Sequence, residues 1–136
     1  MIVRKADRRE LLLLARFEQG LPLRELDRLL GSDRVLVAQR GDDLLGVLRW
    51  GLLWDSVPAL HWLSIAPGQR GKGYGMQLLL QWEQAMCKQR QGRVLAFAPP
   101  EQGAAFLRKL GYHDCGWLHL PGREPALLYQ KELKYQ

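Results

Sequence analysis

A glycine-rich segment, Gln69–Gly75, is the feature that most constrains the fold of this chain. It joins a predicted strand, Leu60–Ala66, to a predicted helix, Gly73–Arg90. Its three alternate glycines lack the Cβ atoms that would hold a ligand away from the main chain, and the first helical turn offers N–H groups without internal partners. Arg70 and Lys72 add positive charge at the same place. The segment therefore predicts a site for a phosphate-bearing ligand.

Two familiar phosphate-binding loops do not fit the spacing of this segment. The loop of nucleotide triphosphatases places Ser or Thr directly after Gly-Lys to bind magnesium, but Gly73 follows Lys72 here. The dinucleotide-binding fingerprint needs a third glycine where this chain has Met76. The first interpretation is excluded and the second is weak, which leaves an ordinary glycine-rich loop or a different ligand.

The segment resembles the acetyl-CoA signature of the GNAT superfamily of N-acetyltransferases: Arg or Gln, two residues, Gly, one residue, then Gly or Ala. Arg70, Gly73 and Gly75 fill that pattern, and residues 63–67 and 76–79 resemble the family's strand end and helix start. The resemblance implies acetyl-CoA as co-substrate. The cofactor-binding residues that it implies are Leu63, Ser64, Ile65, Arg70, Gly71, Lys72, Gly73, Tyr74, Gly75 and Met76.

A second block, residues 101–112, resembles the next motif of the same family, a short helix that ends in Lys-Leu-Gly-Tyr. Gly111 is the residue expected to end that helix. One departure bears on the chemistry. Many family members have a Tyr, the general acid for the leaving thiolate, where this chain has Leu107, and an Asn near the place of Pro100 or Glu101.

Periodicity and turn residues predict the order of the elements. The expected strands are 1–5, 35–40, 44–53, 59–66, 93–98, 112–120 and 126–133, and the expected helices are 8–17, 23–30, 73–90 and a short one before Gly111. This order resembles the GNAT fold, an α/β (α+β) class αβα sandwich. The resemblance implies a mixed, mainly antiparallel sheet of about seven strands, in which parallel strands four and five splay apart.

Length and cysteine content predict one domain, residues 1–136, in a reducing compartment. A chain of 136 residues buries roughly two-thirds of its unfolded surface, enough for one core. The apolar run 11–15 is interrupted by Arg16 and is too short for a signal peptide or a membrane span, so we expect a cytoplasmic protein without a membrane partner. Cys87 and Cys115 form no metal-binding or redox motif and are expected to be packed thiols.

The net charge of +6 favours an anionic ligand, and the phosphates of CoA account for part of it. Nucleic acid is the other candidate, but the basic residues are scattered along the chain. The five tryptophans lie among apolar residues and do not alternate with Lys and Arg, as they would in a base-stacking surface. Nucleic-acid binding is therefore unlikely, and core or pocket positions are expected for the tryptophans.

The resemblance also implies how the fourth strand takes part in the reaction. Its main chain near Leu63 and Ile65 is expected to pair with pantetheine, and the N–H of Leu63 is expected to stabilise the thioester oxyanion. His61 lies two residues before Leu63, on the same side of a regular strand, and is the candidate general base. A structural role for His61 is the alternative, and Asp55 and Ser56 are alternative groups for binding the acceptor amine.

These features predict an acetyl-CoA-dependent N-acetyltransferase that transfers the acetyl group directly to a primary amine in a ternary complex. The acceptor is a small molecule or a peptide, and the family layout places its site between the two N-terminal helices and the loop Pro121–Pro125. The alternative is a CoA-binding sensor or interaction module without turnover, which Leu107 motivates. A homodimer is a possible assembly.

Overall fold

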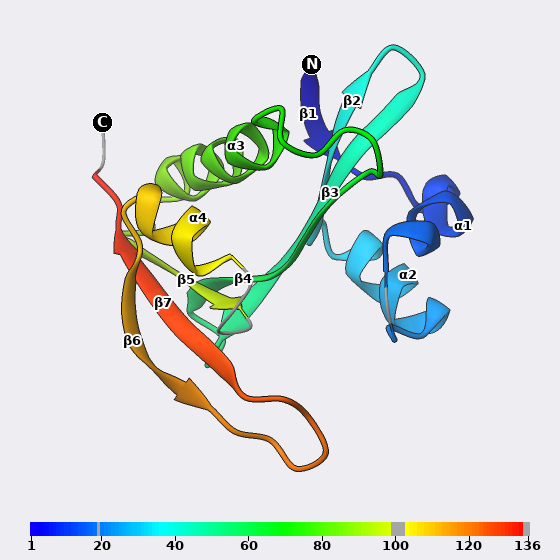
Figure 1. The fold of residues 1–136 in the computed structure, drawn as a ribbon. Coiled ribbons are helices and arrows are strands. Elements are labelled where there is room, and N and C mark those ends of the chain that lie inside the picture. The colour runs from blue at the N-terminus through cyan, green and yellow to red at the C-terminus, as the bar shows by residue number, and fades with distance from the viewer. Residues whose placement is uncertain (19, 99–102, 135–136) are drawn as a thin grey trace. The chain divides into compact units, whose positions relative to one another are not determined.

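The computed structural model describes residues 1–18, 20–98 and 103–134 of the chain, which form a mixed α/β structure (Figure 1). The strands are β1 (Ile2–Lys5), β2 (Val35–Arg40), β3 (Asp43–Leu53), β4 (Val57–Ile65), β5 (Arg93–Ala98), β6 (His113–Leu118) and β7 (Ala126–Glu132). The helices are α1 (Leu11–Leu14), α2 (Leu23–Gly31), α3 (Tyr74–Lys88) and α4 (Ala104–Lys109), and two short 3-10 helices, Arg8–Glu10 and Ala15–Phe17, flank α1.

The seven strands form one mixed sheet in the order β1-β2-β3-β4-β5-β7-β6. β4 and β5 are parallel and are paired at Ala59↔Leu95 and Leu60↔Ala96, after which β4 continues to Ile65. The other neighbouring strands are antiparallel. This arrangement confirms the predicted fold class, including the single parallel pair at strands four and five.

The chain divides into two compact units. The first comprises Met1–Trp50 and Trp62–Trp82, and the second comprises Gly51–His61 and Glu83–Gln136. In the described part of the chain, no helix is both long and apolar enough to cross a membrane.

The first unit has a core of aliphatic side chains contributed by α1, α2, β2 and β3. Leu14, Leu26, Val37 and Val47 are almost completely buried in it. Residues 8–17 were predicted to form one helix, but only Leu11–Leu14 is α-helical. Four consecutive leucines cannot all face the core of a helix, since its residues point in different directions, and Leu12 and Leu13 are indeed exposed.

Sequence signals at the ends of the N-terminal helices explain where they start and stop. Asp7 accepts a hydrogen bond from the main-chain N–H of Arg9 (2.8 Å), while Glu10 accepts one from the N–H of Asp7 (2.8 Å), which makes a capping box. Helix α2 was predicted to end at residue 30, but Gly31 is still helical. The chain turns at Asp33, which has a φ of 57°.

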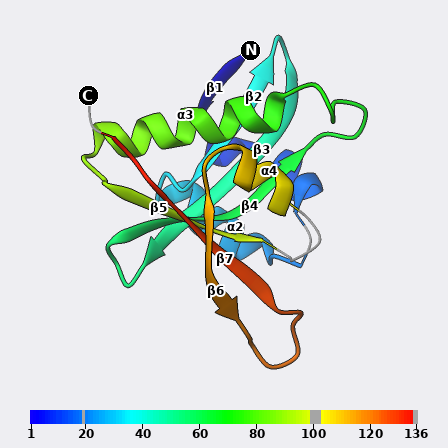
Figure 2. The same ribbon diagram turned by 60° about the vertical axis from the view of Figure 1, so that its left-hand side comes forward.

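The second unit contains β5, β7 and β6, and Figure 2 shows β6 and β7 as a long twisted pair. Two expectations about buried side chains are wrong here. Trp54, in the β3–β4 turn, is 86% exposed and Trp117 is 57% exposed, whereas Trp50 and Trp82 of the first unit are buried as expected. Cys115 is also exposed, because β6 has few buried residues.

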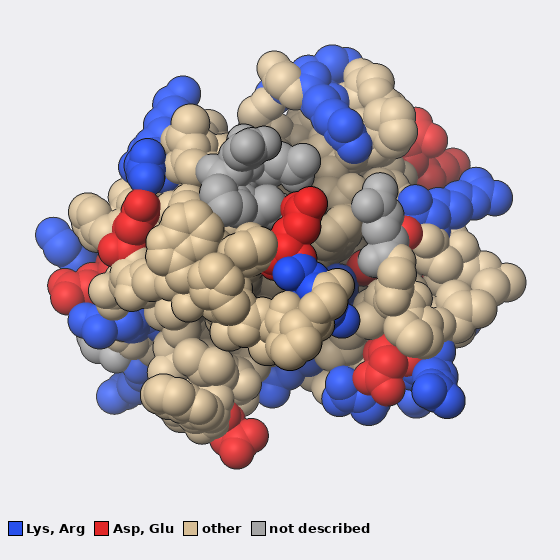
Figure 3. Space-filling view, turned by 60° about the horizontal axis from the view of Figure 1, so that its bottom comes forward, with Lys and Arg blue, Asp and Glu red and all other residues tan. Residues whose placement is uncertain are grey.

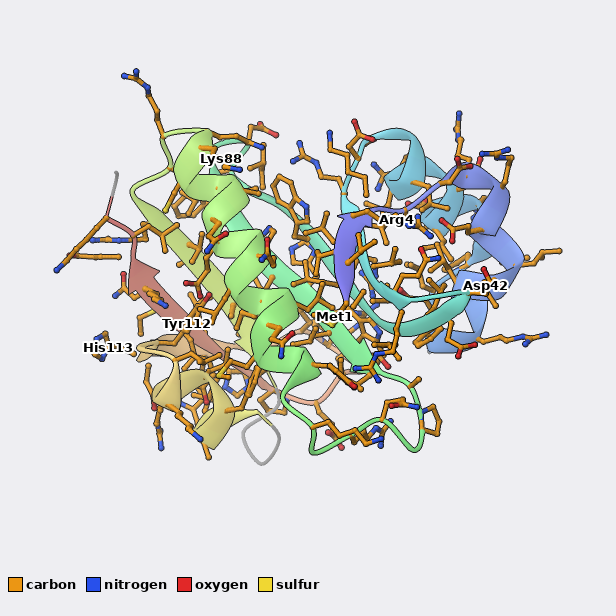
Figure 4. The ribbon with its side chains drawn as sticks, turned by 90° about the horizontal axis from the view of Figure 1, so that it is seen from above. Met1, Arg4, Asp42, Lys88, Tyr112 and His113 are labelled. Carbon is orange, nitrogen blue, oxygen red and sulfur yellow. The ribbon has the colours of Figure 1, made fainter. Side chains whose placement is uncertain are left out.

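A buried ionic cluster lies inside the second unit. Glu83 of α3 is 6% exposed and accepts hydrogen bonds from the hydroxyl of Tyr112 (2.8 Å) and from the Nζ of Lys131 on β7 (2.7 Å). Tyr112, labelled in Figure 4, lies between α4 and β6. Its burial, and then the charge of Glu83, raise the pKa of Tyr112 above its ordinary range. The cluster therefore holds a neutral tyrosine and a buried ion pair.

We expect Lys131→Met to lower the free energy of unfolding by about 3 kcal/mol, because it leaves the Glu83 carboxylate buried without its cation. The matched control is Arg93→Met. It breaks the Arg93–Glu132 pair (3.1 Å), which also joins a strand to β7 but is largely exposed, and it should cost at most about 1 kcal/mol. Urea unfolding measures both variants, and equal losses would contradict the assignment.

Candidate functional site

The connection between β4 and α3 lies within the first unit and has the backbone that an anion site requires. Gly68, Gly71 and Gly73 have φ values of +83°, +77° and +84°, a left-handed conformation that side chains rarely adopt. The first helical hydrogen bond of α3 runs from the N–H of Gln77 to the carbonyl of Gly73 (3.1 Å). The N–H groups of residues 74–76 thus have no partner inside the helix.

The main chain of this connection is also open. A Cβ atom at Gly68, Gly71 or Gly73 would meet no described atom within 4 Å. Gly75, the remaining glycine of the predicted signature, lies in the first turn of α3. No described side chain therefore covers the main chain at Gly68, Gly71 and Gly73, which precede the positive end of the helix, where anions are stabilised.

Two cations predicted to bind the ligand are anchored to this connection. The Nε of Arg70 donates to the carbonyl of Ile65 (3.3 Å), and the Nζ of Lys72 donates to the side-chain oxygen of Gln69 (3.2 Å). Both side chains belong to exposed residues. Their positive charges thus face solvent beside the open main chain.

Tyr74 has a different environment from its neighbours in the predicted set. It is 8% exposed, and its hydroxyl accepts a hydrogen bond from the Nη2 of Arg40, whose guanidinium lies 5.1 Å from the centre of the tyrosine ring. The tyrosine side chain is thereby engaged by the protein, whereas its main-chain N–H has no partner inside the helix. Sequence reasoning missed Arg40, because nothing in the sequence links residues on β2 and α3.

The end of β4 lies close to β3 at Gly46, a glycine to which the sequence patterns gave no role. Leu63, Ser64 and Ile65 are half-buried. A Cβ atom at Gly46 would lie 2.6 Å from the Cδ1 of Ile65 and 3.1 Å from the carbonyl oxygen of Ser64. A side chain at position 46 would force the Ile65 side chain and the Ser64 carbonyl to shift, so β3 contributes to the position of the predicted pantetheine-binding residues.

His61 lies in the second unit and is exposed. Its imidazole packs over Gly51, where a Cβ atom would be 2.8 Å from the Cε1 of the ring, and its centre is 6.0 Å from that of Phe97. The side chain thus has a defined position and is accessible to solvent. A general base needs both properties, and so does an ordinary surface histidine that packs on its neighbours.

The contacts of Gly46 and Gly51 indicate that side chains do not alternate regularly along both β3 and β4. In regular strands, Gly46 and Gly51 lie on opposite faces of β3, whereas Ile65 and His61 share one face of β4. The two contacts together therefore require a break in alternation in one of these strands. The expectation that His61 and Leu63 share a side assumed a regular strand, and it fails only if the break lies in β4 between these two residues.

The structure places Leu107, which stands where many family members have a catalytic Tyr, in the interior of α4 with 2% exposure. The three described tyrosines, Tyr74, Tyr112 and Tyr129, are all buried. Pro100 and Glu101, which fall near the family's Asn, lie outside the described residues. Within the described residues, no tyrosine hydroxyl is exposed as a proton donor for a leaving thiolate.

A buried ion pair lies directly after residues 8–17, the first of the two helices predicted to form the acceptor site. Arg49 of β3 donates two hydrogen bonds to the carboxylate of Glu18 (3.0 and 3.1 Å), and the indole N–H of Trp62 donates to the carbonyl of Phe17 (2.9 Å). The Glu18 side chain is 3% exposed. Sequence reasoning missed this pair, because only the fold brings these residues together.

On one face of the molecule the charges are dispersed (Figure 3). Figure 3 shows one face of the molecule, on which Lys and Arg form separate groups mixed with Asp and Glu. The N-terminal helices and the loop Pro121–Pro125, expected to form the acceptor site, carry the charged residues Arg24, Arg28, Arg123 and Glu124. All four are exposed, as are Asp55 and Ser56. Among the described residues, no group of His, Cys, Asp and Glu has the arrangement of a metal site.

Comparison with known families identifies the chain. The model of the acetyltransferase (GNAT) domain matches residues 31–114, more than half of the chain. The chain therefore belongs to the GNAT family, whose members are acetyl-CoA-dependent N-acetyltransferases, and the predicted recognition and enzyme class are confirmed.

Solved structures agree with this assignment at the level of fold. Ribosomal-protein-alanine N-acetyltransferase from Brucella melitensis is 21% identical, with a TM-score of 0.80 over 98% of this chain and 100% of the other. Chaetomium thermophilum Naa20, solved with a bisubstrate analogue, is 20% identical, with a TM-score of 0.81 over 98% and 87%. Aminoglycoside 6'-acetyltransferase type Ii is 19% identical, with a TM-score of 0.77 over 97% of each chain. A search of curated proteins found no match.

The two turn glycines with nearly equal φ values allow a test of the cofactor site. We expect Gly73→Val to weaken acetyl-CoA binding at least tenfold, because the side chain would occupy the space predicted for the diphosphate. Gly68→Val is the matched control: its φ differs by one degree and its surroundings are equally open, so it carries the same backbone strain outside the signature. Calorimetric titration measures binding, and similar affinities of the two variants would show that the glycines serve only the turn.

Proposed function

We propose that this chain binds acetyl-CoA at the β4–α3 connection and transfers its acetyl group directly to a primary amine in a ternary complex. The observation that carries the proposal is the open, left-handed glycine turn that leads into the unpartnered N–H groups of α3. Family membership supports it, since the residues of the turn fill the family's signature. The proposed phosphate ligands are the main chain of residues 70–76 with the side chains of Arg70 and Lys72.

In the proposed reaction, the amine nitrogen attacks the thioester carbon and the resulting oxyanion collapses with release of the CoA thiolate. The N–H of Leu63 is the proposed donor to the oxyanion, an interaction typically worth about 3 kcal/mol. A thiolate with a pKa near 8.5 leaves without full protonation, so the absence of a tyrosine at position 107 does not prevent the step. The proton lost by the amine must then pass to a base or to water.

His61 is the proposed base. An alkylamine with a pKa of about 10.4 is almost wholly protonated at neutral pH, and presenting it as a nucleophile costs roughly 4 kcal/mol. The imidazole is exposed, is held by Gly51 and Phe97, and lies in the same strand as Leu63. These properties support the assignment, and a purely structural histidine is the alternative.

The acceptor proposed here is a small-molecule or peptide amine, and nucleic acid is disfavoured because the basic residues are scattered along the chain. The similar structures named above include an enzyme named for ribosomal-protein alanine and one named for aminoglycosides, so both classes belong in a first panel of acceptors. We further propose that residues 1–136 act as one domain in the cytoplasm, which agrees with two cysteines that form no disulfide.

A second candidate function is CoA binding without turnover. It is favoured by the burial of Leu107 and of the three described tyrosines, which leaves no described tyrosine in the role of proton donor. Both functions require cofactor binding, so only turnover separates them.

We expect acetyl-CoA at a hundredfold over its dissociation constant to stabilise the folded protein by about 2.7 kcal/mol, because only the folded state carries the site. Thermal unfolding with and without acetyl-CoA measures this effect. In parallel, release of free thiol is followed with peptides, polyamines and aminoglycosides, using N-blocked peptides as the control. Stabilisation without thiol release from any amine would favour the binding module, and no stabilisation at millimolar acetyl-CoA would refute both functions.

His61→Gln should lower kcat/KM by roughly a hundredfold while the affinity for acetyl-CoA stays near that of the wild type. The deficit should shrink as the pH rises, because bulk solvent then deprotonates more of the acceptor amine. His113→Gln, an exposed histidine on β6, is the control and should keep the wild-type rate. A His61→Gln enzyme with the wild-type pH–rate profile would return this residue to a structural role.

A further inference from the structure

Arg40, the last residue of β2, is attached to the first residue of α3 although 34 positions separate the two in sequence. One of its guanidinium N–H groups donates to the hydroxyl of Tyr74, and the same guanidinium lies over the tyrosine ring at 5.1 Å. Two contacts with one aromatic ring fix the position of the charge. Tyr74 is itself buried, so it forms a rigid support for the arginine.

No described carboxylate forms an ion pair with Arg40, although Asp43 lies opposite it in the β2–β3 ladder. Seven arginines of the described chain pair with a carboxylate, but the structure shows no such partner for Arg40 among the described residues. The side chain belongs to an exposed residue, and a guanidinium offers five N–H donors, of which the bond to Tyr74 uses one. Most of its hydrogen-bonding capacity therefore remains available to a ligand.

The position of this charge is unfavourable without an anion. The start of a helix carries the positive end of the helix dipole, where cations are disfavoured and anions are stabilised. Arg70 and Lys72 precede the same helix and also lack a carboxylate partner among the described residues. A bound phosphate would interact favourably with both the helix dipole and the arginine, so the placement of Arg40 is favourable when an anion is bound.

We propose that Arg40 is a third cation of the phosphate site and binds a phosphate of CoA, with Tyr74 as the residue that positions it. The inference rests on the proposed acetyl-CoA binding at the β4–α3 connection. It assigns a ligand contact to β2, a strand outside the acetyl-CoA signature. The phosphate is either the diphosphate or the ribose 3′-phosphate, which share the chemistry that a guanidinium recognises.

Arg40→Gln should weaken the binding of acetyl-CoA about tenfold, since a charge-assisted hydrogen bond is lost. Arg40→Lys should give a smaller loss, because it keeps the charge without the fork-shaped donor set. Tyr74→Phe removes the hydroxyl acceptor and keeps the ring, and it should also weaken binding less than Arg40→Gln. The matched control is Arg34→Gln, which removes another arginine that lies over an aromatic ring, that of Trp50 at 4.3 Å, at the opposite end of β2. It should bind acetyl-CoA like the wild type.

Ligand analogues show whether the effect of Arg40 depends on phosphate. Wild type and Arg40→Gln are titrated with acetyl-CoA, acetyl-3′-dephospho-CoA and S-acetylpantetheine, which has no phosphate of the diphosphate or of the ribose. A loss that disappears with the dephospho analogue assigns Arg40 to the 3′-phosphate, and a loss that persists there but disappears with S-acetylpantetheine assigns it to the diphosphate. Either result supports the proposal.

Two results would overturn it: equal affinity of wild type and Arg40→Gln for acetyl-CoA, or the same loss for S-acetylpantetheine as for acetyl-CoA. Thermal unfolding of the free variants checks that each is folded. Failure of the wild type to bind acetyl-CoA would instead refute the proposed function, so the two failures are distinguishable.

Discussion

The unpartnered main-chain N–H groups at the start of α3 are the constraint on which the candidate site depends. They exist because the chain enters the helix through a turn whose glycines have left-handed backbone angles and no described atom close to them. Around this turn the first unit supplies attachments: Arg70 bonds the end of β4, and Arg40 bonds the first residue of the helix. The side chains thus hold the main chain in place, and the main chain presents the donors.

Much of the fold follows from local sequence. Strand alternation and turn residues predict β2 and β5 with their observed bounds, and the glycine pattern predicts the β4–α3 connection. Strand alternation and turn residues do not predict contacts between residues that are far apart in the sequence. The roles of Arg40, Gly46 and Gly51 depend on which strand or helix passes each of them, and the sequence alone does not contain that information.

Burial was predictable only where periodicity was strong. Leu79, Trp82 and Met86 are spaced for one helix face, and all three are buried. Trp54 and Trp117 have equally apolar side chains but lie in a turn and on an outer strand, and they are 86% and 57% exposed. Apolar character predicts burial only when the element itself has a covered face.

The position of the tyrosines shows how this chain differs from the pattern of its family. Tyr74 positions an arginine, and Tyr112 hydrogen-bonds to a buried glutamate. Leu107 places a buried apolar side chain where many family members have a tyrosine hydroxyl. The hydroxyls have structural tasks, so the chemistry proposed here relies on main-chain donors and on the intrinsic stability of a thiolate.

The irregular pairing of β6 affects how the sheet can meet other chains. β6 is the outermost strand, and its register shifts between Asp114 and Gly116, which leaves Cys115 as an extra residue in a bulge. An outer strand exposes a row of hydrogen-bonding groups that can recruit a strand from another molecule, and a bulge interrupts that row. Although Trp117 and Leu118 are exposed beside it, the edge offers only short stretches for pairing. The bulge thus disfavours continuous pairing of β6 with a strand of another molecule, which would lead to aggregation.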